Sequence, residues 1–201
     1  RTGSSFMIVC LVRCSGVLGL VSWTSKDRLG DIPLQFAVVR DVVIRFSSFV
    51  PTYRPNEAVL LLDGHDQLLI CERMNTGGAW QFPQGVMDAG ESPLEALYRE
   101  VEEEIGLAPA SYEVLESRDG YRYLFPLKLK RGKKGKFDGQ EQTYFLCRLK
   151  EGAPPINVNQ KPREFRSHTW VKPSLFDLQW LPPFKRPVYR EVLRDFFGVE
   201  G

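Results

Sequence analysis

Residues 85–107 constrain the fold more than any other part of the chain, because they carry both end signals of one amphipathic helix. Ser92 suits the N-cap, Pro93 suits the first helical position, and Glu95 completes a capping box. Gly106 suits the left-handed residue that ends a helix. Apolar residues at helical spacing predict a face packed on the core; they are Leu94, Leu97, Tyr98, Val101 and Ile105. The fold must therefore bury one side of this helix.

Four glutamates crowd the C-terminal end of this helix; they are Glu100, Glu102, Glu103 and Glu104. Carboxylates there oppose the helix dipole at a cost of ~0.3–1 kcal/mol each. At about 100° per residue, Glu100, Glu103 and Glu104 share one arc about 100° wide, and Glu102 lies outside it. Hard oxygen ligands on one face are what Mg²⁺ or Mn²⁺ binds. The arc is therefore a candidate metal site, and the alternative is a solvated acidic face.

The residues around these glutamates form a longer pattern, made of Gly85, Glu91, Arg99, Glu100, Glu103, Glu104 and Gly106. Its spacing resembles the Nudix box, the signature of the Nudix hydrolases. The resemblance implies an α/β fold, the Nudix-type α/β/α sandwich with a mixed sheet. It also implies that Glu100, Glu103 and Glu104 are catalytic and bind Mg²⁺, for which Mn²⁺ is a substitute. The backbone carbonyl of Gly85 is implied as a further metal ligand.

Glu91 and Arg99 have a structural role in the same pattern. The resemblance implies that this pair ties the loop to the helix and that Gly106 ends the helix. The alternative is an ordinary surface ion pair, which contributes little to stability.

Motifs outside the box narrow the resemblance; they are residues 53–56 (Tyr-Arg-Pro-Asn), 80–85 (Trp-Gln-Phe-Pro-Gln-Gly), 139–142 (Gly-Gln-Glu-Gln), 164–165 (Glu-Phe) and 184–189 (Phe-Lys-Arg-Pro-Val-Tyr). The set resembles the bacterial RNA pyrophosphohydrolases and the related diadenosine tetraphosphate hydrolases. This resemblance implies that Arg54 and Arg73 approach phosphates and that Phe165 stacks on a base, a contact worth ~1–3 kcal/mol. The alternatives are surface charges for the two arginines and a core position for Phe165.

The identity of the general base is open between two carboxylates. One is Glu100, and the other is Glu141 in the 139–142 segment, which is expected to be a loop next to a strand. An exposed turn residue is the alternative for Glu141. His65 and His168 have no partner residue at a spacing typical of a catalytic site, and both are interpreted as structural. Displacement at phosphorus needs in-line positioning and charge stabilisation rather than a covalent nucleophile.

The charge balance favours a nucleotide or RNA-end substrate over a protein that coats nucleic acid. The formal net charge is only +2, so double-stranded DNA is not an expected partner. A local basic run consists of Lys128, Lys130, Arg131, Lys133, Lys134 and Lys136. It is either a solvated loop or, beside an acidic metal site, a surface that attracts a polyphosphate or RNA 5′ end, with Lys136 as a candidate contact. The four cysteines show neither metal nor disulfide spacing, which favours a cytoplasmic location.

The chain divides on sequence into an N-terminal extension of uncertain structure, residues 1–50, and a Nudix domain, residues 51–201. Residues 6–23 are largely apolar but contain Arg13, so they are marginal as a membrane span and poor as a signal peptide. Residues 34–46 are expected to contain one or two strands. In the domain, strands are expected at 57–62, 67–72, 112–115, 121–129, 142–149 and 168–171, and a second helix at 186–197.

These features together predict a Mg²⁺-dependent Nudix pyrophosphohydrolase acting on a nucleoside polyphosphate or a 5′-triphosphorylated RNA end. One alternative is hydrolysis of diadenosine tetraphosphate to ATP and AMP. An alternative of another class is a non-catalytic Nudix domain that binds a nucleotide or RNA end as a sensor, although a pure binder has no use for so many repelling carboxylates. A membrane-tethered form would require residues 6–23 to insert. The oligomeric state and the choice among substrates stay open.

Overall fold

The computed structural model describes residues 7–14, 17–24, 37–39, 42–44, 50–126 and 136–200. The chain forms two compact units, Arg1–Phe49 and Val50–Gly201. In the first unit, β1 (Met7–Cys14) pairs antiparallel with β2 (Val17–Thr24), and β3 (Ala37–Val39) with β4 (Val42–Ile44). The expectation of strands within residues 34–46 is therefore confirmed. No helix in the described ranges is both long and apolar enough to cross a membrane.

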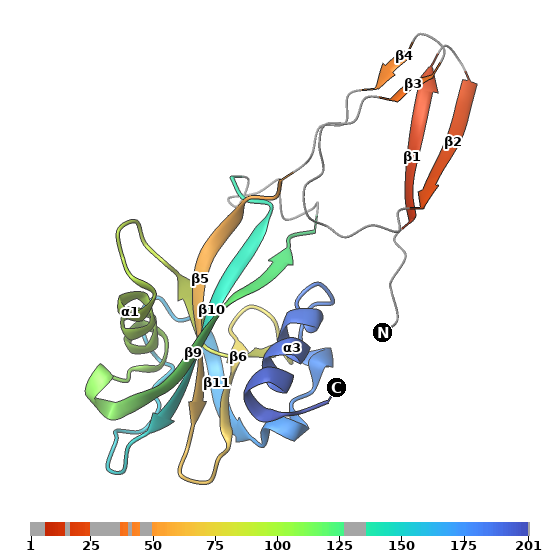
Figure 1. The fold of residues 1–201 in the computed structure, drawn as a ribbon. Coiled ribbons are helices and arrows are strands. Elements are labelled where there is room, and N and C mark those ends of the chain that lie inside the picture. The colour runs from red at the N-terminus through yellow and green to blue at the C-terminus, as the bar shows by residue number, and fades with distance from the viewer. Residues whose placement is uncertain are drawn as a thin grey trace. The chain divides into compact units, whose positions relative to one another are not determined.

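The second unit is built on one mixed seven-stranded sheet (Figure 1). Its main strands run in the order β11 (Phe165–Val171), β6 (Leu68–Arg73), β5 (Tyr53–Leu62), β10 (Gly139–Leu149) and β9 (Tyr112–Leu124). The short strand β7 (Trp80–Gln81) pairs with β6, and β8 (Gln84–Val86) pairs with β5. Only β5 and β10 pair in parallel among these strands.

Two helices cover opposite faces of the sheet, α1 (Pro93–Ile105) and α3 (Arg186–Phe197) (Figure 1). Alternating residues of β5 supply both interfaces. Leu60 packs in the same buried cluster as Val192 of α3, whereas Val59 packs with Val101 of α1. Three 3₁₀ turns complete the unit, at Pro109–Ser111, Pro173–Leu175 and Leu178–Trp180. The predicted α/β/α sandwich with a mixed sheet is confirmed.

Several strand boundaries differ from the sequence prediction; β5 begins at Tyr53 rather than at residue 57, and β11 begins at Phe165 rather than at residue 168. The expected strands at 112–115 and 121–129 form one strand, β9, up to Leu124, and residues 127–129 lie outside the described ranges. The 139–142 segment, expected to be a loop, is the first part of β10.

The predicted ends of α1 are confirmed. Ser92 is the N-cap and forms a capping box with Glu95, whose carboxylate accepts the Ser92 backbone N–H at 2.8 Å. Gly106 follows the helix at a φ of 72°, in the left-handed region, and its N–H donates to the Glu102 carbonyl at 3.0 Å. These caps fix where the glutamate-bearing last turns of the helix lie.

Replacing Ser92 with alanine is expected to lower the free energy of unfolding by about 1 kcal/mol, because the helix loses a side-chain cap. Urea denaturation followed by circular dichroism measures this change. Ser117→Ala, at an exposed position of β9, is the control and should alter stability by less than about 0.5 kcal/mol. Equal stability of both variants would show that the capping box does not hold the helix end.

Candidate active site

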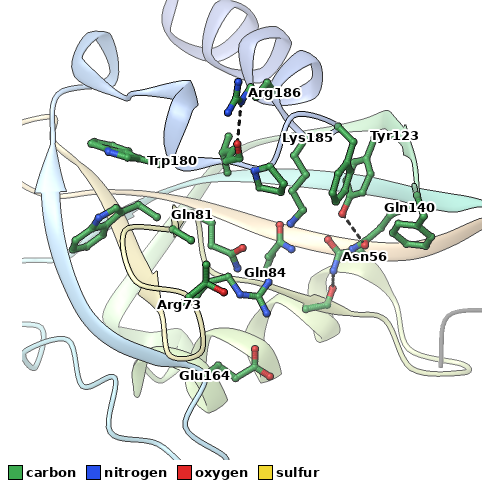
Figure 2. A pocket seen from close by; sticks show the side chains of 18 of the residues that line it. Asn56, Arg73, Gln81, Gln84, Tyr123, Gln140, Glu164, Trp180, Lys185 and Arg186 are labelled. Carbon is green, nitrogen blue, oxygen red and sulfur yellow. Dashed lines mark hydrogen bonds between the residues drawn. The ribbon is translucent and has the colours of Figure 1, made fainter. Parts of the chain in front are cut away.

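A cleft of about 1000 Å³ opens on the α3 face of the sheet, and Arg99 and Glu100 from the middle of α1 also line it. Its walls come from β5, the turn after β6, the 84–86 strand and the segment leading into α3. Figure 2 shows Arg73, Glu164 and Lys185 directed into this space from three different parts of the chain. An open cleft with charged side chains on its walls suits a charged, extended ligand.

The three glutamates of the arc lie at graded depths along α1. Glu104 is 4% exposed, and its carboxylate accepts the Gln84 backbone N–H at 2.8 Å. Glu100 lines the cleft with its side chain 17% exposed, while the Glu103 side chain is 57% exposed. Within the described ranges, no group of three or more His, Cys, Asp or Glu side chains is arranged to hold a metal ion as it stands.

Electrostatics nevertheless favour a cation at this place. Burial raises the pKa of the Glu104 carboxyl well above its usual range, and the nearby charges of Glu164 and Glu100 add to the effect. Burial is also the main cause that raises the pKa of Glu100. Crowded, desolvated carboxylates are stabilised in their charged form by a nearby positive charge. The donor set, oxygen atoms of carboxylates, fits a hard divalent ion.

Arg99 connects the loop before α1 to the helix itself. Its Nε and Nη2 atoms donate to Glu91 at 2.9 and 2.8 Å, and Nη2 also donates to the Val86 carbonyl at 3.0 Å. Hydrogen bonds from Arg99 are the main cause that lowers the pKa of Glu91 to about 2. The remaining nitrogen, Nη1, donates to Glu100 at 2.7 Å. The pair of hydrogen bonds to Glu91 needs two nitrogen donors in a fixed plane, which Arg provides and Lys does not.

Gly85 allows the loop and the helix to touch. A Cβ atom at Gly85 would lie 1.7 Å from the Cδ atom of Glu100, so only glycine fits there. The Gly85 carbonyl accepts a hydrogen bond from the Asn56 amide, and Asn56 in turn accepts one from Gln142 at 2.6 Å. The carbonyl implied as a metal ligand is thus oriented by a buried amide chain from β5 and β10.

A family model described as the NUDIX domain matches residues 52–196. The chain belongs to the Nudix family. The RNA pyrophosphohydrolase of Saccharophagus degradans is 41% identical over 149 residues, which are 73% of this chain and 87% of that protein. The RNA pyrophosphohydrolase of Helicobacter pylori strain P12 is 44% identical over 155 residues, with 74% and 96% covered. Among solved structures, the E. coli dihydroneopterin triphosphate pyrophosphohydrolase has the same fold, with a TM-score of 0.53. The two chains are 14% identical, and the match covers 72% of this chain and 97% of that chain.

The arginines expected to contact phosphates both line the Nudix cleft. Arg54 extends from β5, and its buried Nε atom has no hydrogen-bond partner among the described residues. Arg73 ends β6 and reaches toward Gln84 (Figure 2). Lys136 is exposed and is not among the residues that line the cleft; its carbonyl accepts a hydrogen bond from Thr52. The rest of the basic run lies outside the described ranges.

Two expected site residues lie elsewhere. Phe165 is 1% exposed in the core cluster beside α1, so no base can stack on its ring without opening the core. Its other interpretation, a core position, accounts for this burial. Glu141 points away from the cleft because Gln140 and Gln142, its neighbours in β10, point toward it. The Glu141 carboxylate accepts a hydrogen bond from Arg122 at 2.9 Å instead.

Several residues of the cleft were not assigned from the sequence. Glu164 lines it, and its charge raises the pKa values of Glu100 and Glu104. The Glu-Phe motif predicts a site residue at this place, but the structure puts its acid, Glu164, in the cleft and its aromatic ring, Phe165, in the core. Trp80 and Trp180 also line the cleft, with ring centroids 6.4 Å apart and planes at 54°. Trp180 ends the 3₁₀ turn Leu178–Trp180, about 100 residues after Trp80 in the chain, so no local sequence pattern connects the two rings.

Proposed function

We propose that this Nudix protein is a Mg²⁺-dependent pyrophosphohydrolase that acts on the triphosphorylated 5′ end of RNA. One observation carries the proposal: Glu100 of the carboxylate arc lines a cleft that also holds two arginines, Arg54 and Arg73. Such a site binds a polyphosphate and the cation that neutralises it. The two relatives described above, at 41% and 44% identity, are named RNA pyrophosphohydrolases, which favours RNA over diadenosine tetraphosphate. The catalytic domain proposed is residues 51–201.

The cation would be held by Glu100, Glu103 and Glu104, with the Gly85 carbonyl and Glu164 as further oxygen donors. When bound, Mg²⁺ neutralises phosphate charge and lowers the pKa of a coordinated water, and Mn²⁺ is expected to substitute. Arg99 keeps the loop and the helix in one arrangement through Glu91, as its bonds at 2.8 and 2.9 Å indicate.

In this proposal the arginines of the cleft bind the phosphates of the RNA end, and its aromatic rings contact a base. Arg54 and Arg73 would donate to phosphate oxygens, a contact that guanidinium groups make in pairs of hydrogen bonds. Trp80 and Trp180, rather than Phe165, would offer ring faces to a base, since both are only partly buried and line the cleft. Glu100 is the better of the two expected bases, because it lines the cleft, whereas the Glu141 carboxylate accepts a hydrogen bond from Arg122 outside it.

Turnover of 5′-triphosphorylated RNA and of diadenosine tetraphosphate, assayed side by side, tests the proposal. We expect release of pyrophosphate or phosphate from the RNA, with 5′-monophosphorylated RNA as product, and loss of this activity in excess EDTA. Restored activity on adding Mg²⁺ serves as the control for chelation. Production of ATP and AMP from the dinucleotide, with no reaction on RNA, would move the function to the alternative substrate. Binding of the RNA end without turnover of either substrate would favour the sensor.

A further inference from the structure

Glu57 is a buried acid of β5 that the Nudix box does not include. It is 1% exposed, and neither carboxylate oxygen has a hydrogen-bond partner among the described residues. Burial, followed by the negative charge of Glu100, raises the pKa of this carboxyl to about 8. A buried polar group without a partner is unfavourable and calls for a physical cause. A β-branched apolar residue would suit this strand position better.

The pairing of β5 with β8 places Glu57 directly opposite Gly85. Opposed residues of antiparallel strands project from the same face, with Cβ positions ~4.5–5.5 Å apart. Gly85 has no side chain, and the carboxyl group of Glu100 fills the vacant space, because a Cβ there would lie within 2.1 Å of both Glu100 oxygens. The carboxyl groups of Glu57 and Glu100 are therefore neighbours between the sheet and α1.

Glu57, Glu100 and Glu104 line one small void between β5 and α1, beside Leu97 and Val101. The void is too narrow to admit a water molecule. An oxygen ligand of Mg²⁺ lies only ~2.0–2.1 Å from the ion, so the ion itself needs less room than a water molecule does. Its coordinated waters would lie on the side of the cleft, which Glu100 also lines. Small rotations of the three carboxylates would give it oxygen atoms from both the strand and the helix.

Arg99 is the positive group near Glu57, and it lowers the pKa of this acid only in part. Its Nε and Nη2 atoms donate to Glu91, Nη2 also donates to the Val86 carbonyl, and Nη1 donates to Glu100. The contacts of Nε and Nη2 hold the guanidinium on the loop, and Nη1 contacts Glu100 rather than Glu57. The charge of a cation between the three carboxylates would stabilise Glu57 more directly.

We propose that Glu57 is a further ligand of a divalent cation, bound on the sheet side of α1 together with Glu100 and Glu104. The inference rests on the proposed function, which requires the cation at this helix. It adds a residue from the neighbouring strand to the ligands that the helix provides. It also explains why the strand carries an unpartnered acid at the position facing Gly85.

The test is a titration of the full-length chain with Mn²⁺, in which electron paramagnetic resonance measures the free ion. We expect Glu57→Gln, which keeps the side-chain shape, to raise the dissociation constant of one Mn²⁺ by about tenfold or more, in the range that ligand-supporting residues reach. Glu57→Val should behave alike and should show a higher Tm than the wild type in EDTA, since the unpartnered acid is gone. The rise in Tm on adding Mg²⁺ should be smaller in both variants.

Glu116→Gln, an exposed acid of β9, is the control and should bind Mn²⁺ as the wild type does. Unchanged Mn²⁺ affinity in both Glu57 variants, with wild-type binding intact, would overturn the role of Glu57 and leave the proposed function standing. A wild type that binds no Mn²⁺ would overturn both. A crystal grown with Mn²⁺ should show the anomalous peak of the ion within ligand distance of a Glu57 oxygen, and a peak far from it would overturn the inference.

Discussion

Replacing Glu103 with glutamine is expected to lower kcat on 5′-triphosphorylated RNA by about a thousandfold. Loss of a charged metal ligand removes several kcal/mol of transition-state stabilisation, and each ~1.4 kcal/mol is a factor of ten. Glu103 is the cleanest ligand to change, because its side chain is 57% exposed and its ion pair with Arg99 is long, at 3.4 Å. Single-turnover kinetics at saturating Mg²⁺ measure the effect on the chemical step.

The matched control for this change is Glu102→Gln, the same substitution one position earlier on α1. Glu102 lies outside the arc and is exposed, so its variant should keep kcat within about twofold of the wild type on the same reasoning. The Tm of both variants in EDTA should stay near that of the wild type, because both side chains are exposed. Equal activity of Glu103→Gln and Glu102→Gln would show that position on the arc does not matter, and the metal-site assignment would fail.

Local signals made the Nudix helix predictable from the sequence. Ser92, Glu95 and Gly106 act on backbone groups within one turn of themselves, so their effect does not depend on the rest of the fold. The second helix, α3, begins and ends at the residues predicted, Arg186 and Phe197, because its apolar spacing is equally local. The family resemblance rested on the same short-range pattern.

Long-range placement was not predictable in the same way. Phe165 and Glu164 are neighbours in the chain, but Glu164 lines the cleft while Phe165 enters the core. Which of the two faces the ligand depends on how β11 begins, and one residue of register exchanges them. Glu141 was misplaced for the same reason, since its segment was expected to be a loop. Glu57 gave no signal at all, because its importance comes from strand pairing with Gly85.

Replacing Gly85 with alanine is expected to lower activity by about a hundredfold or more and to destabilise the fold by ~1–3 kcal/mol. The added methyl would lie 1.7 Å from the Cδ atom of Glu100, so either the loop or the carboxylate must move. A displacement of Glu100 large enough to admit the methyl would break its hydrogen bond from Arg99 at 2.7 Å, and Arg99 is itself held by Glu91. Urea denaturation and RNA turnover, measured on the same preparation, separate the loss of stability from the loss of rate.

Gly64→Ala is the matched control, because a Cβ atom in the turn between β5 and β6 meets nothing within 4 Å. We expect this variant to keep the wild-type rate and to change stability by less than about 0.5 kcal/mol. A Gly85→Ala protein that folds stably but loses activity would mean that the position of the Glu100 carboxylate, rather than its presence alone, sets the rate. Full activity in Gly85→Ala would instead mean that the Glu100 carboxylate can be displaced without loss of rate. That result would contradict its assignment as a ligand of the cation.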